Sequence, residues 1–342
     1  MSKKIALIRG DGAGPELVDA MLTVFNAVDT KAEIIKCDAG LEWWQENGGS
    51  SFIPPETWEI LKSSDACYKG PTTTLPTPGT PKSVAVSIRQ FFELYANVRP
   101  IKTFPNQVGP LGKVDYVCVR EGTEGMYTGL EHRLSDDCAI TIRKITRKGC
   151  TRIADYAFKM ARDKKWKKVI AIHKGNILKE TDGFFLEIVD EVSKNYPEIE
   201  WENYFVDNFS QQLVKNPQRF DHNIVMSTNL FMDILSEESS GLVGSIGCIY
   251  SANIGDNYAM FEPAHGSAPK YKGMDKVNPT ATILSGAWML EYIGEKNLAD
   301  AIFKATNEVI EEGVHVTYDL KGNESTSGMA KAIADKATHV LA

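Results

Sequence analysis

The sequence predicts an α/β protein in which helices pack on a sheet. Short apolar segments typical of buried strands alternate with segments whose apolar residues recur at helical spacing. The chain has 342 residues, 43% hydrophobic and 24% charged, which is enough for one large core or for two domains. No internal repeat and no low-complexity linker divides it.

The first expected strand is Lys4–Arg9, which leads into a glycine turn at residues 10–15. A helix follows with Pro15 in its first turn, where a missing N–H is tolerated. Its apolar residues are spaced so that they share one helical face: Leu17, Met21, Val24, Phe25 and Val28.

The remaining elements are expected in a similar alternation. Strands are expected at residues 116–119, 168–173, 204–207 and 223–226. Helices are expected at residues 151–163, at 281–293, at 299–311 and after Thr181, whose hydroxyl is expected to cap its helix. Residues 71–81, rich in Thr, Pro and Gly, form either an active-site loop or a plain surface connection.

Composition and charge disfavour several classes of function. The net charge of -7 argues against a general nucleic-acid binder and weakly against a membrane surface role. The six cysteines are scattered without C-x-x-C spacing, which is typical of free thiols in a reducing compartment. No apolar run is long enough to span a bilayer, and the first expected strand leaves no room for a targeting segment. A cytoplasmic location is therefore expected.

The glycine turn is not a Rossmann fingerprint. Gly10, Gly12 and Gly14 follow a strand, but the G-x-G-x-x-G pattern requires glycine where the chain has Pro15. A tight turn that leads into a helix is the better interpretation, with a cofactor role for its amides as an additional hypothesis.

Three arginines lie at the ends of apolar segments, where chains commonly meet a cleft. These are Arg89, Arg99 and Arg120, and Ser83 precedes the first of them by six residues, where it either caps a helix or faces a ligand. Guanidinium groups bind carboxylates in a two-pronged geometry, so the three would suit a di- or tricarboxylate. Three unrelated surface arginines are the alternative.

Three stretches carry a family resemblance: 83–89, Leu94-Tyr95-Ala96-Asn97-Val98-Arg99-Pro100, and residues 120–127. Together they resemble the β-decarboxylating dehydrogenases, which include isocitrate, isopropylmalate, homoisocitrate and tartrate dehydrogenases. The similarity extends from Gly10 to Asp319.

The resemblance implies the fold of the isocitrate/isopropylmalate dehydrogenases, which is α/β but not Rossmann, with two domains around a mixed sheet and a cleft between them. The large domain would comprise residues 1–96 and 244–342 and include the cofactor loop. The small domain would comprise 97–243, with a dimer clasp at about 125–148. The active sites would be shared between the two subunits of a homodimer.

Asp233 and Glu237 stand four residues apart, which places both carboxylates on one face of a helix. The resemblance implies that they bind Mg²⁺ or Mn²⁺, and that Asp207 is a third ligand, supplied by the partner subunit. The chain departs from the family pattern at Met232, usually glycine, and at Glu237, usually aspartate.

The resemblance also assigns the proton transfers. Lys174 follows an apolar strand and would deprotonate the substrate hydroxyl across the dimer interface, since nearby cations and a metal can lower a lysine pKa. Tyr127 would protonate the carbanion that remains after CO₂ leaves. Asn176 would contact the substrate or the nicotinamide.

Residues 261–271 resemble the adenine-binding loop of the family. The positions expected to bind the cofactor are Thr74, Glu262, His265, Gly266, Lys270, Tyr271, Asn278, Tyr318 and Asp319. NAD-dependent members have an aspartate at the first of the positions that Lys270 and Tyr271 occupy here. A lysine and a tyrosine suit a 2′-phosphate better than an aspartate does, which favours NADP over NAD. The arginine that completes such a pocket in bacterial NADP-dependent members would fall near Gly322 and is missing, although Lys321 could replace it.

The substrate expected from the resemblance is isocitrate. Isopropylmalate dehydrogenases have a glutamate and two leucines where this chain has Lys82, Ala85 and Val86, so that substrate is disfavoured. Ser83 matches the serine that binds the γ-carboxylate of isocitrate. Ala85 replaces a usual asparagine, which leaves room for homoisocitrate. A non-catalytic regulatory subunit is the remaining alternative, but it would be expected to lose some of these residues.

Overall fold

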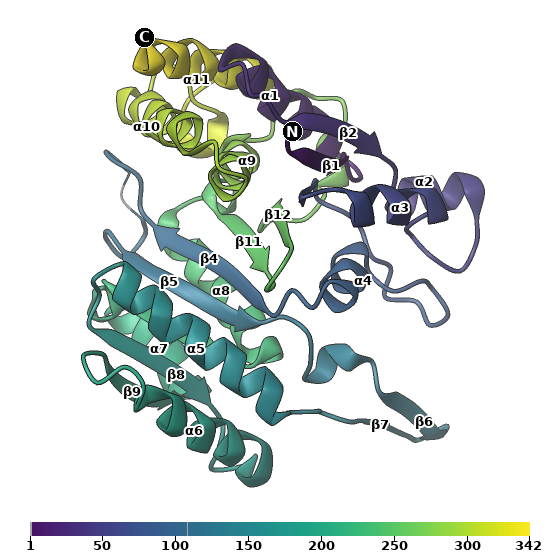
Figure 1. Cartoon of the computed structure of the whole chain (residues 1–342), viewed down its shortest axis with the longest axis vertical. Coiled ribbons are helices and arrows are strands. Elements are labelled where there is room, and N and C mark those ends of the chain that lie inside the picture. Colours follow the sequence, from purple (N-terminus) through teal and green to yellow (C-terminus); the bar gives the residue numbers. More distant parts are fainter. Residues whose placement is uncertain (1, 108) are drawn as a thin grey trace.

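The computed structural model describes residues 2–107 and 109–342. Within these residues, ten strands form one mixed sheet in the order β2-β1-β3-β12-β11-β4-β5-β10-β8-β9 (Figure 1). The bounds of these strands are β1 Lys4–Ile8, β2 Glu33–Cys37, β3 Ala66–Lys69, β4 Ala96–Lys102, β5 Asp115–Glu121, β8 Lys168–His173, β9 Glu200–Phe205, β10 Asn223–Ser227, β11 Tyr250–Ile254 and β12 Ala259–Pro263.

The α-helices are α1 Gly14–Ala27, α2 Leu41–Asn47, α3 Pro55–Ser63, α4 Val84–Phe91, α5 Arg147–Asp163, α6 Lys179–Ser193, α7 Val206–Lys215, α8 Asn229–Val243, α9 Thr280–Tyr292, α10 Lys296–Glu312 and α11 Thr326–Leu341. Short 3₁₀ turns include η1 Met126–Thr128, η4 Pro269–Tyr271 and η5 Tyr318–Leu320. The predicted α/β class is confirmed, as is the position of Pro15 in the first turn of α1.

The two outer parts of the sheet are parallel, and its centre is antiparallel. Strands β2-β1-β3-β12 run together, as do β5-β10-β8-β9, and antiparallel pairs join β12 to β11, β11 to β4 and β4 to β5. The two ends of the chain supply the strands β2, β1, β3, β12 and β11 on one side of the sheet. The middle of the chain supplies β4, β5, β10, β8 and β9 on the other side. The sheet is continuous across the β11–β4 pair, and the division into two domains there stays a prediction.

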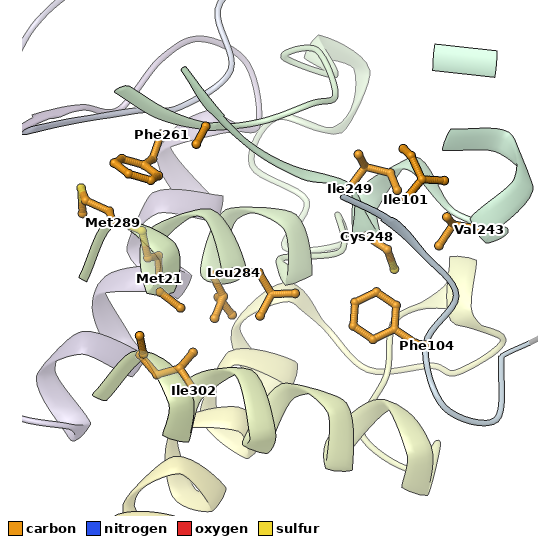
Figure 2. Packing of buried hydrophobic residues seen from close by; sticks show 14 of the residues in the cluster. Met21, Ile101, Phe104, Val243, Cys248, Ile249, Phe261, Leu284, Met289 and Ile302 are labelled. Carbon is orange, nitrogen blue, oxygen red and sulfur yellow. The ribbon is translucent and has the colours of Figure 1, made fainter. Parts of the chain in front are cut away.

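Strand alternation decides which side chains reach each face of the sheet. In β5, Val117 and Val119 pack in the cluster that contains the buried face of α5. Tyr116 and Cys118 point to the opposite face, into the main core that includes α8. Figure 2 shows another part of this core, where α1, α9 and α10 bring Met21, Leu284, Met289 and Ile302 together near Phe261 of β12.

A two-stranded hairpin projects from the body of the protein (Figure 1). It consists of β6 Glu131–Ser135 and β7 Cys138–Thr141, and every residue of both strands is exposed. Leu134 and Ile140 are among its exposed apolar side chains. The hairpin falls within the predicted clasp at residues 125–148, and its pairing with a second subunit stays a prediction.

Two local predictions are wrong. Thr181 does not cap its helix, because α6 begins earlier, at Lys179, and the Thr181 hydroxyl instead accepts a hydrogen bond from Arg143. The strand expected at residues 204–207 ends at Phe205, and Asp207 lies in the first turn of α7, where a negative charge is favourable. No helix of the described residues combines the length and apolarity needed to cross a membrane.

Candidate active site

A cavity of about 480 Å³ lies beside the central strands and the start of α4. It is lined by residues from β3, β4, β5, β12, α4, α8 and η1, and by the loop that follows β3. The structure thereby brings together most of the residues predicted from sequence, namely Thr74, Ser83, Arg89, Arg99, Arg120, Tyr127, Asp233, Glu237, Glu262, His265 and Gly266.

The pairing of the strands places polar residues in one row across the sheet. Asn253 of β11 stands opposite Asn97 of β4, which in turn stands opposite Arg120 of β5. The Asn97 amide donates to Asn253 at 2.8 Å, and the Asn253 amide donates to Glu262 of β12 at the same distance. Because Arg99 lies two residues from Asn97, it points to the same face of the sheet.

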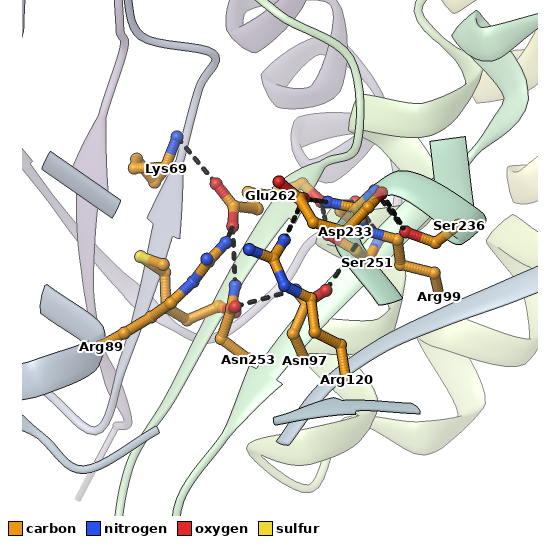
Figure 3. A network of polar contacts seen from close by, with 12 residues as sticks. Lys69, Arg89, Asn97, Arg99, Arg120, Asp233, Ser236, Ser251, Asn253 and Glu262 are labelled. Carbon is orange, nitrogen blue, oxygen red and sulfur yellow. Dashed lines mark hydrogen bonds and ion pairs between the residues drawn. The ribbon is translucent and has the colours of Figure 1, made fainter. Parts of the chain in front are cut away.

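Glu262 is the centre of a buried ionic group (Figure 3). Its two carboxylate oxygens each lie 2.8 Å from a cation, the ammonium of Lys69 and the guanidinium of Arg89. Burial raises the pKa of Glu262, but the attraction of Lys69 and Arg89 is larger, so the pKa lies well below its usual range. Glu262 thus orients Arg89 at the cavity wall. This contact is separate from the cofactor role that the sequence predicted for Glu262.

Arg120 is fixed at the end of β5 by three protein groups. Its Nε and Nη2 donate to the side-chain oxygen of Asn229 at 2.9 and 2.7 Å, and its Nη1 binds Asp233. Burial, with repulsion from Arg89, lowers the pKa of Arg120 to about 10, so the guanidinium remains charged at neutral pH. The ring of Tyr127 stacks on this guanidinium at 4.9 Å, and its hydroxyl donates to Asp233.

Arg99 connects β4 to the next turn of α8. Its Nη1 donates to the Ser236 hydroxyl at 2.9 Å and to Glu237 at 2.6 Å, and its Nε donates to the Asn97 side-chain oxygen at 3.2 Å. Asp233 and Glu237 of α8 are therefore both paired with arginines. Glu237 pairs with Arg99, and Asp233 pairs with Arg120 and, at 3.8 Å, with Arg99.

Asp233 and Glu237 of α8 fit a divalent cation in part. Both line the cavity, their side chains are 31% and 41% exposed, and carboxylate oxygens suit Mg²⁺ or Mn²⁺. Within the described part of the chain, however, no three His, Cys, Asp or Glu side chains are grouped so that they could hold a metal ion. One chain therefore supplies two of the three predicted ligands at this cavity.

Lys174 and Asp207 form a second location, outside the lining of the cavity. Strands β8 and β9 are paired so that His173 stands opposite Phe205, which brings the residues after both strands together. The Lys174 ammonium lies 2.5 Å from the Asp207 carboxylate, which is 67% exposed. Asn176 is exposed in the turn that follows Lys174 and also lies away from the cavity lining.

The cofactor loop has two features that suit a ligand. The His265 Nε2 is buried and has no hydrogen-bond partner among the described residues, and burial lowers the pKa of this imidazole. A Cβ built on Gly266 would meet no protein atom within 4 Å, so the packing of the chain itself does not require glycine there. Close approach of a bound molecule would require it.

The other predicted cofactor residues form two small groups. The Asn278 amide donates to Asp319 at 2.9 Å, and Asn278 is buried. The rings of Tyr271 and Tyr318 stack with centroids 6.3 Å apart, and the ammonium of Lys276 lies 4.9 Å from the Tyr318 ring. Lys270 is exposed in η4, beside Tyr271.

Comparison with known proteins identifies the family. The family profile described as isocitrate/isopropylmalate dehydrogenase matches residues 4–333. The chain belongs to this family. Its members are decarboxylating dehydrogenases.

Individual relatives carry different substrate names. The chain is 41% identical to a 3-isopropylmalate/3-methylmalate dehydrogenase of Methanocaldococcus jannaschii, over 97% of this chain and 98% of that protein. It is 42% identical to a homoisocitrate dehydrogenase of the same organism, over 96% of each. The crystal structure of isocitrate dehydrogenase from Methylococcus capsulatus matches with a TM-score of 0.93 and 44% identity, over 98% of this chain and 99% of that one.

In this member of the family, the glycine turn after β1 holds the start of α2, the loop that follows β3 and the cofactor loop. The Asp11 carboxylate accepts hydrogen bonds from the amides of Leu41, Glu42 and Thr73. The turn's own amides are occupied by protein atoms, since Gly12 donates to Glu42 and Ala13 donates to the Ser267 carbonyl. The hypothesis that these two amides contact a cofactor is therefore wrong.

Sequence reasoning missed several residues of the site. Lys69, Asn97, Asn229 and Asn253 all make side-chain hydrogen bonds or ion pairs within it. For Lys69 a signal existed, because a lysine that ends a short apolar strand is the same feature that singled out Lys174. Ser83 has the N-cap position of α4 but its side chain makes no capping bond, so the predicted capping role is wrong. The other predicted role, facing a ligand, stays a prediction.

Proposed function

We propose that this member of the family oxidises and decarboxylates isocitrate to 2-oxoglutarate with reduction of NADP and a requirement for Mg²⁺ or Mn²⁺. The charge of the cavity lining supports a tricarboxylate. Four cationic side chains, Lys69, Arg89, Arg99 and Arg120, face three carboxylates, Asp233, Glu237 and Glu262, which leaves one positive charge. With a divalent cation at Asp233 and Glu237 the excess of positive charge is three, which balances three substrate carboxylates.

The residues of this chain have separable tasks in the proposed reaction. Arg89, Arg99 and Arg120 bind and orient the carboxylates, since fixed guanidinium groups need little reorganisation when substrate arrives. Lys174 accepts the proton of the substrate hydroxyl, and Tyr127 donates a proton to the carbon that CO₂ leaves. When bound, a divalent cation held by Asp233 and Glu237 would supply a Lewis acid for the substrate oxygens. A nicotinamide held beside Thr74, His265 and Gly266 would supply the hydride acceptor.

The proposed preference for NADP rests on Lys270, Tyr271 and Tyr318, with Lys276 as a further cation beside Tyr318. Cationic and phenolic groups suit the 2′-phosphate of NADP, whereas a carboxylate would suit the free ribose hydroxyls of NAD. The cofactor would occupy the side of the cavity formed by Thr74, His265 and Gly266.

The proposed assembly is a homodimer in which each cavity is completed by the partner. Lys174 and Asp207 lie together but outside the cavity of their own chain, so a second copy is the source of a base and a third metal ligand. The exposed hairpin β6–β7, with Leu134 and Ile140, suits the predicted clasp. A regulatory subunit without activity would be expected to lack residues that this chain retains.

Homoisocitrate is the second candidate substrate. Ser83, Ala85 and Val86 all line the cavity, and the small side chain of Ala85 leaves space for one more methylene. The names of the relatives support both acids, because they include homoisocitrate and isocitrate dehydrogenases. Isopropylmalate lacks the third carboxylate that the charge of the cavity would bind.

A steady-state panel tests the proposal. Isocitrate, homoisocitrate, isopropylmalate, malate and tartrate would each be assayed with NAD and NADP in the presence of Mg²⁺ or Mn²⁺. We expect the highest kcat/KM for isocitrate with NADP. A higher kcat/KM for homoisocitrate would move the proposal to the second candidate, and a preference for isopropylmalate would contradict it.

A further inference from the structure

Asp182 holds the backbone of Lys174 in place. Lys174 lies in the turn between β8 and α6, and Asp182 lies in the first turn of α6, where it is fully buried. The Asp182 carboxylate accepts a hydrogen bond from the Lys174 backbone N–H at 2.6 Å. This bond closes the turn, so the position of the Lys174 side chain depends on where Asp182 is held.

Arg143 determines where Asp182 is held. Its side chain reaches α6 from the segment after β7 and forms an ion pair with the other oxygen of Asp182. The same guanidinium donates to the hydroxyls of Thr181 at 2.9 Å and Thr228 at 2.7 Å. It also lies 5.1 Å from the ring centre of Phe231 in the first turns of α8.

The pair therefore connects three segments that the proposed reaction requires to be aligned. These are the end of the hairpin segment, the turn that carries Lys174, and the beginning of the helix that carries Asp233. A buried ion pair by itself is weak evidence for stability, because the loss of hydration offsets much of the attraction. Here each partner also hydrogen-bonds to a neighbouring segment, which favours a role in fixing geometry.

We propose that Asp182 and Arg143 are positioning residues for Lys174, which set the distance over which its amino group reaches the substrate held by the partner subunit. The inference rests on the proposed function, in which Lys174 is the base. Neither residue lines the cavity in its own chain. Loss of the pair should consequently reduce turnover while substrate binding remains nearly unchanged.

The test compares Asp182→Ala, Arg143→Met and Arg143→Lys with Val189→Ala, which removes a buried contact from the same helix without touching Lys174. We expect Asp182→Ala and Arg143→Met to lower kcat roughly 10- to 100-fold, as for a misplaced reacting group. The KM for isocitrate should stay within about threefold of the parent value. Arg143→Lys should recover part of the loss, and Val189→Ala should lower stability but not kcat.

Several outcomes would overturn the inference. A fall in kcat no larger than that of Val189→Ala, or a rise in KM at constant kcat, would each do so. If Asp182→Ala does not fold, the two Arg143 variants decide, and failure of all three to fold would show that the role is structural. Lys174→Met is assayed alongside, because a Lys174→Met enzyme that retains turnover contradicts the proposed function instead.

Discussion

The guanidinium of Arg89 donates to the carboxylate of Glu262 at 2.8 Å, between residues 173 positions apart in the chain. Both side chains are buried, and Lys69 approaches the same carboxylate from β3. The Arg89 Nε has no hydrogen-bond partner among the described residues. Glu262 thus orients Arg89, the cation proposed to bind substrate, and leaves the Arg89 Nε available as a donor.

Replacing Glu262 with Gln should destabilise the protein. The substitution leaves Lys69 and Arg89 close together with no negative charge between them, and breaking such a buried pair typically costs about 3 kcal/mol. Urea denaturation at fixed protein concentration measures the effect. Glu312→Gln is the matched control, because Glu312 pairs with Lys336 at the surface, where the expected loss is below about 1 kcal/mol. Equal losses for the two variants would count against this account.

Replacing Arg120 with Lys should reduce kcat/KM although the charge is kept. Lysine cannot reproduce the fork that binds Asn229 and Asp233 together, and lost bonds to charged groups correspond to about 10- to 100-fold. The measurement is steady-state kinetics with isocitrate. Arg147→Lys is the control, because Arg147 pairs with Glu191 at the surface. Unchanged kcat/KM in Arg120→Lys would show that the guanidinium geometry is dispensable.

The sequence was sufficient for part of the helices and strands and for most of the lining of the cavity, but it did not locate β2, β3, β11 or β12. Periodicity predicts α1 and β8, and the sequence motifs single out Arg89, Arg99 and Arg120. The sequence was insufficient to predict contacts between strands that lie far apart in the chain. Asn97 and Asn253 are 156 residues apart and meet only because β4 pairs with β11. No local sequence pattern determines which strands become neighbours. The contact between Asn97 and Asn253 could therefore be seen only in the strand order of the folded sheet.

Cofactor choice should depend on Lys270. Replacing Lys270 with Asp introduces a negative charge next to the expected 2′-phosphate, so kcat/KM with NADP should fall by about tenfold or more, while activity with NAD is kept or rises. The ratio of kcat/KM values for the two cofactors reports this directly. Lys331→Asp, at an exposed position of α11 that is not among the predicted cofactor residues, is the control. A ratio that changes equally in both variants would refute the assignment.

If active sites are shared between subunits, mixing two inactive variants should restore activity. Lys174→Met and Tyr127→Phe should each be nearly inactive alone, but mixed dimers combine an intact Tyr127 from one subunit with an intact Lys174 from the other. After dissociation and reassembly of an equal mixture, about a quarter of the parent activity is expected, since half of the dimers are mixed and each has one intact site. Activity that stays at the level of the separate variants would show that sites are not shared.

The central claim is a metal-dependent oxidation that also releases CO₂. It is tested most directly by measuring the NADPH and the CO₂ produced from isocitrate in one reaction, with Mg²⁺ present and again after chelation. The account predicts equal amounts of both products with Mg²⁺ and neither product without it. NADPH formed without CO₂, or undiminished activity after chelation, would contradict it.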